Sequence, residues 1–232
     1  MISVSRLWAN STPRQPPVAM ARVLPGAVVS TLLVVAMGVF LRVAPSPNAA
    51  EQAVTIWFNG ARTGVIGGIT TAVYDSLEPI FAVIITALLA VTIWIVTRRL
   101  RLAITFAVVV AATWLPIAVF KFLFLRARPD ALLLPHPVTP APFDASYPSG
   151  HVAFVTALAM AFVLIAGTFT KRVVTIVLGA LAVILVALSV LIDGVHFPTD
   201  VIASIVWGVG IAPLVWHIWR RLTDSIGSPS SS

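Results

Sequence analysis

The chain has 232 residues, of which 59% are hydrophobic and 10% are charged, and its mean hydropathy is +1.03. Soluble domains carry about 25% charged residues, so this composition excludes a soluble globular protein and predicts an integral membrane protein. The net charge of +7 would suit nucleic acid, but the basic residues flank apolar segments, so we expect no nucleic-acid partner. The absence of cysteine excludes disulfides, thiolate chemistry and cysteine-bound metal.

Six apolar segments approach the roughly 20 residues that a helix needs to cross a bilayer: 24–44, 77–96, 102–120, 151–169, 173–192 and 201–219. They predict an all-α fold, a six-helix transmembrane bundle that forms one domain over residues 24–222. Residues 1–23 and 223–232 are expected to be flexible cytoplasmic tails. Basic residues ahead of the first apolar run also fit a signal peptide, but no small-residue cleavage site follows, so we expect this helix to be retained.

The charges are sorted between the two sides of this six-span arrangement. Basic residues precede the first span, fill the second and fourth turns and follow the sixth span, at Arg22, Arg98, Arg99, Arg101, Lys171, Arg172, Arg220 and Arg221. Most acidic residues fall on the opposite side. The positive-inside rule therefore predicts that both termini lie in the cytoplasm. The charge pattern, the absence of cysteine and the compact form suit a bacterial inner (plasma) membrane protein. A basic cluster at 121–128 breaks the rule, so insertion topology does not explain it.

Two connections are expected on the outer side of the membrane. Residues 45–76 include "EQAVTIWFNGA", whose apolar residues recur at helical spacing and predict a short helix at the interface, with Trp57 at headgroup level. Residues 129–149 are rich in proline and too long for a tight turn, which is typical of a loop that faces a substrate.

The stretch "KFLFLRARPD" places cations at the outer end of the third span. Lys121 and Arg128 are seven residues apart, so they share a face if the helix continues to Arg128 and stops before Pro129. Such a pair can clamp an anion. The alternative is that the long side chains simply reach the interface.

The stretch "YPSGH" precedes the fourth span. Ser149 is expected at the helix N-terminus, where the amides of Gly150 and His151 and the helix dipole favour an anion. The alternative is a plain serine N-cap beside an unrelated histidine.

The stretch "DGVHFPTD" leads into the sixth span. Pro198 suits the first helical turn, and Asp200 lies four residues after His196, within reach of an imidazole N–H. A histidine held by a carboxylate can act as a base, a nucleophile or a metal ligand. The alternative is that His196 and Asp200 pair with each other and have only a structural role.

The six-span topology brings all three stretches to the outer face of the membrane. Two histidines, two cations, helix amides and a carboxylate are the groups needed for displacement at phosphorus. The expected ligand of the basic cluster is therefore a phosphate.

These stretches resemble the three signature motifs of the type 2 phosphatidic acid phosphatase (PAP2) superfamily, in the family's order. The resemblance implies that His196 is a nucleophile that forms a phosphohistidine, that Asp200 orients it and that His151 is the general acid. It implies that phosphate oxygens are bound by Lys121, Arg128, Ser149 and Gly150. It also implies that no metal or other cofactor is needed.

One position departs from the family pattern. The third motif normally has an arginine six residues before the nucleophile, where this chain has Val190. Arg126 is an additional cation that could substitute as a weak phosphate ligand, although a regular helix would put it on a different face from Arg128. The acidic Asp193 could repel a phosphate, or hold a sugar or a cation.

The sequence therefore favours a lipid phosphatase that takes its substrate from the bilayer at the outer face. The resemblance leaves phosphatidic acid, phosphatidylglycerol phosphate, undecaprenyl or decaprenyl diphosphate and polyprenyl-phosphoryl sugar phosphates open. A lipid phosphotransferase and a non-catalytic lipid-phosphate binder or transporter are alternatives. A vanadate-dependent haloperoxidase shares the anion site, but those enzymes are soluble. The oligomeric state stays open.

Overall fold

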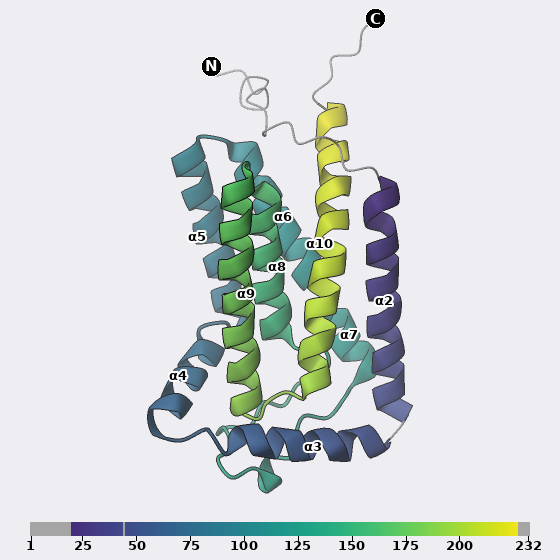
Figure 1. Ribbon diagram of the computed structural model, residues 1–232, viewed down its shortest axis with the longest axis vertical. Coiled ribbons are helices and arrows are strands. Elements are labelled where there is room, and N and C mark those ends of the chain that lie inside the picture. The colour runs from purple at the N-terminus through teal and green to yellow at the C-terminus, as the bar shows by residue number, and fades with distance from the viewer. Residues whose placement is uncertain (1–19, 44, 227–232) are drawn as a thin grey trace, which may run out of the picture.

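The computed structural model describes residues 20–43 and 45–226, and over these ranges the chain is helical with no strand (Figure 1). The elements in order are α2 (Met20–Val43), α3 (Pro45–Asn59), α4 (Gly64–Asp75), α5 (Pro79–Thr97), α6 (Leu100–Trp114), α7 (Pro116–Phe124), η1 (Ala131–Leu133), α8 (Gly150–Ile165), α9 (Phe169–Ile192) and α10 (Pro198–Ile226). The all-α prediction is confirmed. Helix α2 starts inside the expected N-terminal tail and α10 runs into the expected C-terminal tail; the rest of both tails lies outside the described residues.

Within residues 20–43 and 45–226, five helical segments are long and apolar enough to cross a membrane, with α6 and α7 counted together. The fourth expected span corresponds to α8, which is apolar but has only 16 residues because the helix ends before Ala166. Large aliphatic side chains are exposed along the outer helices, such as Leu32 on α2 (63%), Val96 on α5 (76%) and Leu178 on α9 (61%). An apolar outer surface suits lipid as the solvent. The protein is thus a multi-pass membrane protein.

The third expected helix differs from the prediction in its course. Helix α6 gives way to α7 at Leu115, directly before Pro116, whose ring nitrogen cannot donate to the helix ladder. Helix α7 then ends at Phe124, because Leu125 is left-handed with φ 47°. The expectation of a helix that continues to Arg128 was therefore wrong, and Arg126 and Arg128 lie in the extended segment after it.

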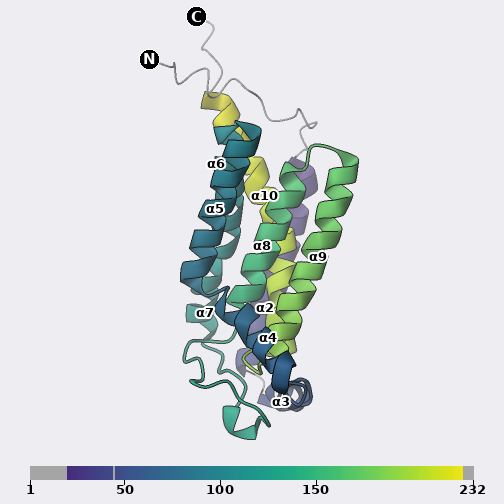
Figure 2. The same cartoon turned by 90° about the vertical axis from the view of Figure 1, so that its left-hand side faces the viewer.

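Helix α8 lies at the centre of the bundle and packs against α6, α9 and α10 (Figure 2). Its side chains Val152, Ala153, Phe154 and Ala157 are fully buried, as expected of a helix that is apolar on all sides. Trp114 lies edge-on to Phe154, which helps to fix α6 against α8. The packing of α8 against these helices fixes the position of its N-terminus relative to them.

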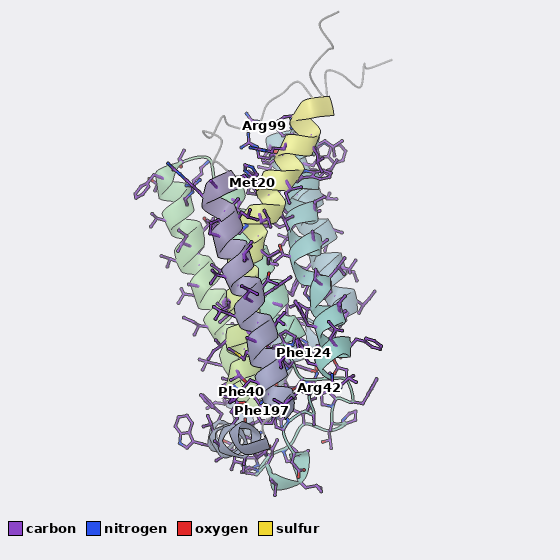
Figure 3. All side chains as sticks on the ribbon, turned by 90° about the vertical axis from the view of Figure 1, so that its right-hand side faces the viewer. Met20, Phe40, Arg42, Arg99, Phe124 and Phe197 are labelled. Atoms are coloured by element: carbon purple, nitrogen blue, oxygen red, sulfur yellow. The ribbon has the colours of Figure 1, made fainter. Side chains whose placement is uncertain are left out.

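Helix α3 crosses one end of the bundle, and α4 and the loop from 125 to 149 lie at the same end (Figures 1 and 2). The helix expected in "EQAVTIWFNGA" is thus present, and Trp57 is exposed. Helix α4 was not predicted. Figure 3 shows Arg42, Phe124 and Phe197 at this end, and Met20 and Arg99 at the other. We call the end that carries α3 the site end.

Candidate active site

The three motifs reach the site end from different elements. Lys121 comes from the last turn of α7, and Arg128 from the segment after it. Ser149 caps α8, and Gly150 and His151 begin it. His196 lies in the turn between α9 and α10, and Asp200 lies in the first turn of α10. The structure therefore brings the predicted residues together from three helices, α7, α8 and α10, and two connections.

His196 lies between a carboxylate and a guanidinium. Its Nδ1 is 3.4 Å from Asp200 Oδ2, which also accepts from the Phe197 amide at 2.9 Å. Its Nε2 is 3.5 Å from Arg128 Nη1. A guanidinium only donates, so Nε2 carries the lone pair and Nδ1 carries the proton that faces Asp200. Both His196 and Asp200 are fully buried.

The surroundings of His196 favour the neutral imidazole. Burial lowers its pKa well below the ordinary value, and the positive charges of Arg128 and Lys121 lower it further. A neutral ring at physiological pH keeps a lone pair on Nε2, which a nucleophile requires.

The two predicted phosphate-binding cations meet at a carboxylate. Asp144 Oδ2 is 2.5 Å from Lys121 Nζ, and Asp144 Oδ1 is 2.6 Å from Arg128 Nη2. Arg128 Nη1 also donates to the Val195 carbonyl at 2.6 Å, which turns the guanidinium towards His196. Partial burial works to raise the pKa of Asp144, but the hydrogen bonds and charges of both cations outweigh it and lower the pKa to about 2.

The N-terminus of α8 matches the expected geometry. Ser149 Oγ accepts from the Val152 amide at 3.5 Å and so caps the helix. Gly150 lies beside Lys121, because a Cβ atom there would be 3.9 Å from Lys121 Cε. The first-turn amides have no acceptor within the helix and carry the positive end of its dipole.

His151 lies against Tyr74 of α4. The two rings stack with centroids 4.2 Å apart, and among the described residues the buried Nε2 of His151 has no hydrogen-bond partner. Burial raises the pKa of Tyr74, so its hydroxyl stays neutral. Helix α4, which the sequence did not predict, therefore orients the proposed general acid.

A cavity of about 800 Å³ opens beside these groups. Four of the predicted site residues line it, namely Lys121, Arg128, Gly150 and His151. Its wall is otherwise partly apolar, with Trp114, Leu115, Ile117 and Ala118 from α6, α7 and the residue between them. A phosphate at its polar end could therefore keep an apolar chain within the same cavity.

Arg126 does not join the other cations. Its Nη1 is 2.5 Å from Asp200 Oδ1 and its Nη2 is 2.5 Å from Glu51 Oε2, so its guanidinium lies between two carboxylates. The expectation of a weak phosphate ligand at this residue thus has no support in its contacts. Val190 is fully buried in an apolar cluster with Val152, so this position serves packing.

Asp193 contacts protein side chains at the end of α9. Its Oδ1 is 3.0 Å from Arg62 Nε and accepts from Thr70 Oγ1 at 2.6 Å. The carboxylate therefore ties α4 and the turn before it to the end of α9.

Within residues 20–43 and 45–226, no three histidine, aspartate or glutamate side chains group so as to hold a metal ion.

Sequence reasoning missed two acidic residues at the site, Asp144 and Glu51. A signal for both was present, because the chain has only eight acidic residues and the charge pattern places these two on the same side as the basic cluster. Their partners could not be read from the sequence, since each contacts residues far away along the chain.

Comparison with known proteins gives one family. The model of the PAP2 superfamily matches residues 101–224, just over half of the chain. An undecaprenyl-diphosphatase of Sulfolobus acidocaldarius is 31% identical over 115 residues, which are 49% of this chain and 52% of that protein. The match thus spans about half the length of this curated relative.

A solved structure has a similar fold. The crystal structure of a transmembrane PAP2-type phosphatidylglycerolphosphate phosphatase from Bacillus subtilis matches with a TM-score of 0.69 and 18% identity, covering 85% of this chain and 97% of that one. At this identity the likeness concerns the fold. The family model covers the segment that carries all three motifs, and the structure gathers those motifs at one end of the bundle; the chain belongs to the PAP2 superfamily.

Proposed function

We propose that this protein is a membrane lipid phosphatase that hydrolyses a phosphate monoester or diphosphate of a lipid. The observation that carries the proposal is the placement of His196, with Nδ1 facing Asp200 and Nε2 facing Arg128. A lone pair beside a guanidinium that can bind phosphoryl oxygens supports attack on a phosphoryl group held at that guanidinium. The name of the Sulfolobus relative and that of the Bacillus structure supply two substrate candidates, a polyprenyl diphosphate and phosphatidylglycerol phosphate.

In the first step Lys121, Arg128 and the first amides of α8 hold the phosphoryl oxygens. His196 Nε2 attacks phosphorus, the bond from phosphorus to the leaving oxygen breaks, and His151 gives that oxygen a proton. The product is a phosphohistidine, and its positive ring keeps the Nδ1 proton against Asp200. The cations stabilise the negative charge that builds up on the oxygens.

In the second step water replaces the leaving group. His151, now neutral, takes a proton from water as the new oxygen–phosphorus bond forms and the bond from nitrogen to phosphorus breaks. Phosphate leaves, His196 is neutral again and His151 is protonated for the next cycle.

The lipid chain and the topology belong to the same proposal. The apolar wall of the cavity supports a substrate that enters from the bilayer with its chain between the helices. With α8 as a sixth span, the basic residues would face the cytoplasm and the site end would lie outside a bacterial inner membrane.

Release of inorganic phosphate by the purified protein in detergent tests the proposal. Across a set of lipid monophosphates and diphosphates, at least one should be hydrolysed, and His196→Ala should remove turnover. His217→Ala is the matched control, because His217 is also buried on the bundle interior but lies far along α10. Orthovanadate should inhibit competitively, because bound vanadate mimics the five-coordinate transition state at phosphorus. Turnover that survives in His196→Ala would rule out the assigned nucleophile.

The role of His151 has its own test. A good leaving group needs less proton donation, so His151→Ala should slow hydrolysis of an alkyl phosphate far more than that of p-nitrophenyl phosphate. The measurement is the ratio of kcat/KM for the two substrates in wild type and variant. Equal losses for both substrates would remove His151 from the role of general acid.

A further inference from the structure

Arg126 is among the most enclosed charged side chains of the site end, with 3% of its side chain exposed. Its Nη1 donates to Asp200 Oδ1 at 2.5 Å and to Thr199 Oγ1 at 2.8 Å. Its guanidinium carbon lies 4.2 Å from the centroid of the Phe197 ring. All three of these partners are within four residues of His196, so Arg126 contacts the turn that presents the proposed nucleophile.

Glu51 of α3 holds the other side of this guanidinium. Its Oε2 is 2.5 Å from Arg126 Nη2 and accepts from Thr199 Oγ1 at 2.9 Å, and its Oε1 accepts from the Thr199 amide at 2.9 Å. A carboxylate at an amide of the first helical turn is favourable, because it meets unpaired N–H groups and the positive end of the dipole. Glu51 therefore fixes both Arg126 and the start of α10.

Asp200 needs such a partner. Its carboxylate is fully buried, and a buried charge without a counter-charge is strongly unfavourable. Arg126 takes Oδ1, which leaves Oδ2 for the Phe197 amide and for His196 Nδ1. The guanidinium thus both compensates the charge and fixes which oxygen faces the imidazole.

We propose that Arg126, held by Glu51, is a positioning residue for the nucleophile: it keeps Asp200 ionised and oriented so that His196 Nδ1 carries the proton and Nε2 carries the lone pair. The inference rests on the proposed phosphatase function and adds two residues to it, Arg126 and Glu51, which lie outside the three motifs. It also gives the extra cation of the first motif a task other than phosphate binding.

Three variants that each replace an arginine by methionine separate positioning from phosphate binding and from stability. Arg126→Met should lower kcat about 10- to 100-fold, as expected when an outer partner of an oriented histidine is lost. Its KM and vanadate inhibition constant should change less than about threefold, since the phosphate-binding groups stay in place. Arg128→Met should instead raise the vanadate constant. Arg101→Met, which breaks a pair with Asp224 and Thr223 outside the site end, controls for the loss of an arginine.

A double-mutant cycle with Asp200→Asn tests the route of the effect. If Arg126 acts through Asp200, the double variant should be no slower than Asp200→Asn alone. Glu51→Gln is the milder second variant, which keeps the inference testable if Arg126→Met does not fold. It should lower kcat less than Arg126→Met does and leave the vanadate constant unchanged. Arg126→Lys keeps a positive charge but cannot bridge both carboxylates, so its kcat should lie between that of the wild type and that of Arg126→Met.

The outcomes are distinguishable. A vanadate inhibition constant that rises in Arg126→Met, together with additive losses of kcat in the double-mutant cycle, would show that Arg126 binds phosphate and would overturn the positioning role. Unchanged kcat in folded Arg126→Met or Glu51→Gln, in a wild type whose turnover depends on His196, would overturn the inference and leave the proposed function standing. A folded wild type that hydrolyses no lipid phosphate would overturn both.

Discussion

At the scale of single residues, Asp144 sets the charge balance of the proposed phosphate site. Its two oxygens contact Lys121 and Arg128, so one negative charge faces two positive ones. A phosphoryl group that uses the same donors has to displace this carboxylate or share the cations with it. Asp144 is half exposed, so water screens these contacts and the competition is modest.

Asp144→Asn should therefore tighten binding of a phosphate mimic. Loss of the competing charge should lower the vanadate inhibition constant by about two- to fivefold, which corresponds to an ion pair of roughly 0.4–1 kcal/mol. Asp130→Asn is the control in the same loop, because that carboxylate accepts from the Leu132 amide. If Asp144→Asn raised the constant, Asp144 would be holding the cations in place for phosphate.

The low pKa of His196 predicts the pH profile. As the proposed nucleophile, His196 must be neutral, and it is neutral above its own pKa, which burial and Arg128 place well below the ordinary value of 6.5. The acid limb of kcat/KM, which reports the free enzyme, should therefore fall below pH 6.5, and activity should persist as the pH is lowered through 6.5. The pH profile of His151→Ala should show the same acid limb in kcat/KM. An acid limb at or above pH 6.5 in both proteins would contradict the assignment.

At the scale of elements, the site depends on how closely helices approach. Tyr147, directly before the Pro148-Ser149 corner, donates from its hydroxyl to the Val34 carbonyl of α2 at 2.6 Å. Helix α2 also packs along α10, where Gly210 faces Ser30. Small residues at such a contact let the backbones come close, which is common between membrane helices. Helix α2, which carries none of the three motifs, thus supports two elements that do.

Gly210→Ala should destabilise the bundle. The added Cβ would lie 2.1 Å from Ser30 Oγ and 2.4 Å from Ser30 Cβ, so the helices would have to move apart, at about 1–3 kcal/mol for overpacking. The measurement is the midpoint of thermal unfolding in detergent. Gly26→Ala on α2 is the matched control, because a Cβ there meets nothing within 4 Å. Equal midpoints for the two variants would show that the α2–α10 contact tolerates expansion.

At the scale of the whole molecule, the charges are divided between the two ends. The start of α2, the turns α5–α6 and α8–α9 and the end of α10 gather at one end (Figures 1 and 2), and most basic residues of the described ranges lie there, apart from the cations of the site end. The site end carries the motifs and most of the acidic residues. Under the positive-inside rule, this division predicts that the site end faces away from the cytoplasm.

Single cysteines can test this orientation, since the chain has none of its own. In intact bacterial cells a membrane-impermeant maleimide should label Ala141→Cys, an exposed position of the loop at the site end. Gly167→Cys, exposed in the turn α8–α9, should react only after the membrane is permeabilised. The reverse pattern would place the site in the cytoplasm.

What the sequence determined by itself rests on composition and on short spacings. Apolar runs are sufficient to indicate helices that suit a membrane, because each helix satisfies its own backbone hydrogen bonds. The spacing of four between His196 and Asp200 places both in one turn, and the serine before Gly150 caps the helix, so both local arrangements were predictable.

Only the tertiary structure decided which charges meet. Lys121 and Arg128 were expected to share a helical face, but the helix ends at Phe124 and they meet through Asp144 of the following loop. Arg126 pairs with Asp200, 74 residues away, and with Glu51, 75 residues away. Such pairs depend on how the helices pack and where the chain reverses. A buried charge needs a counter-charge nearby in space, and the packing of the helices, not the order of the sequence, decides which residue supplies it.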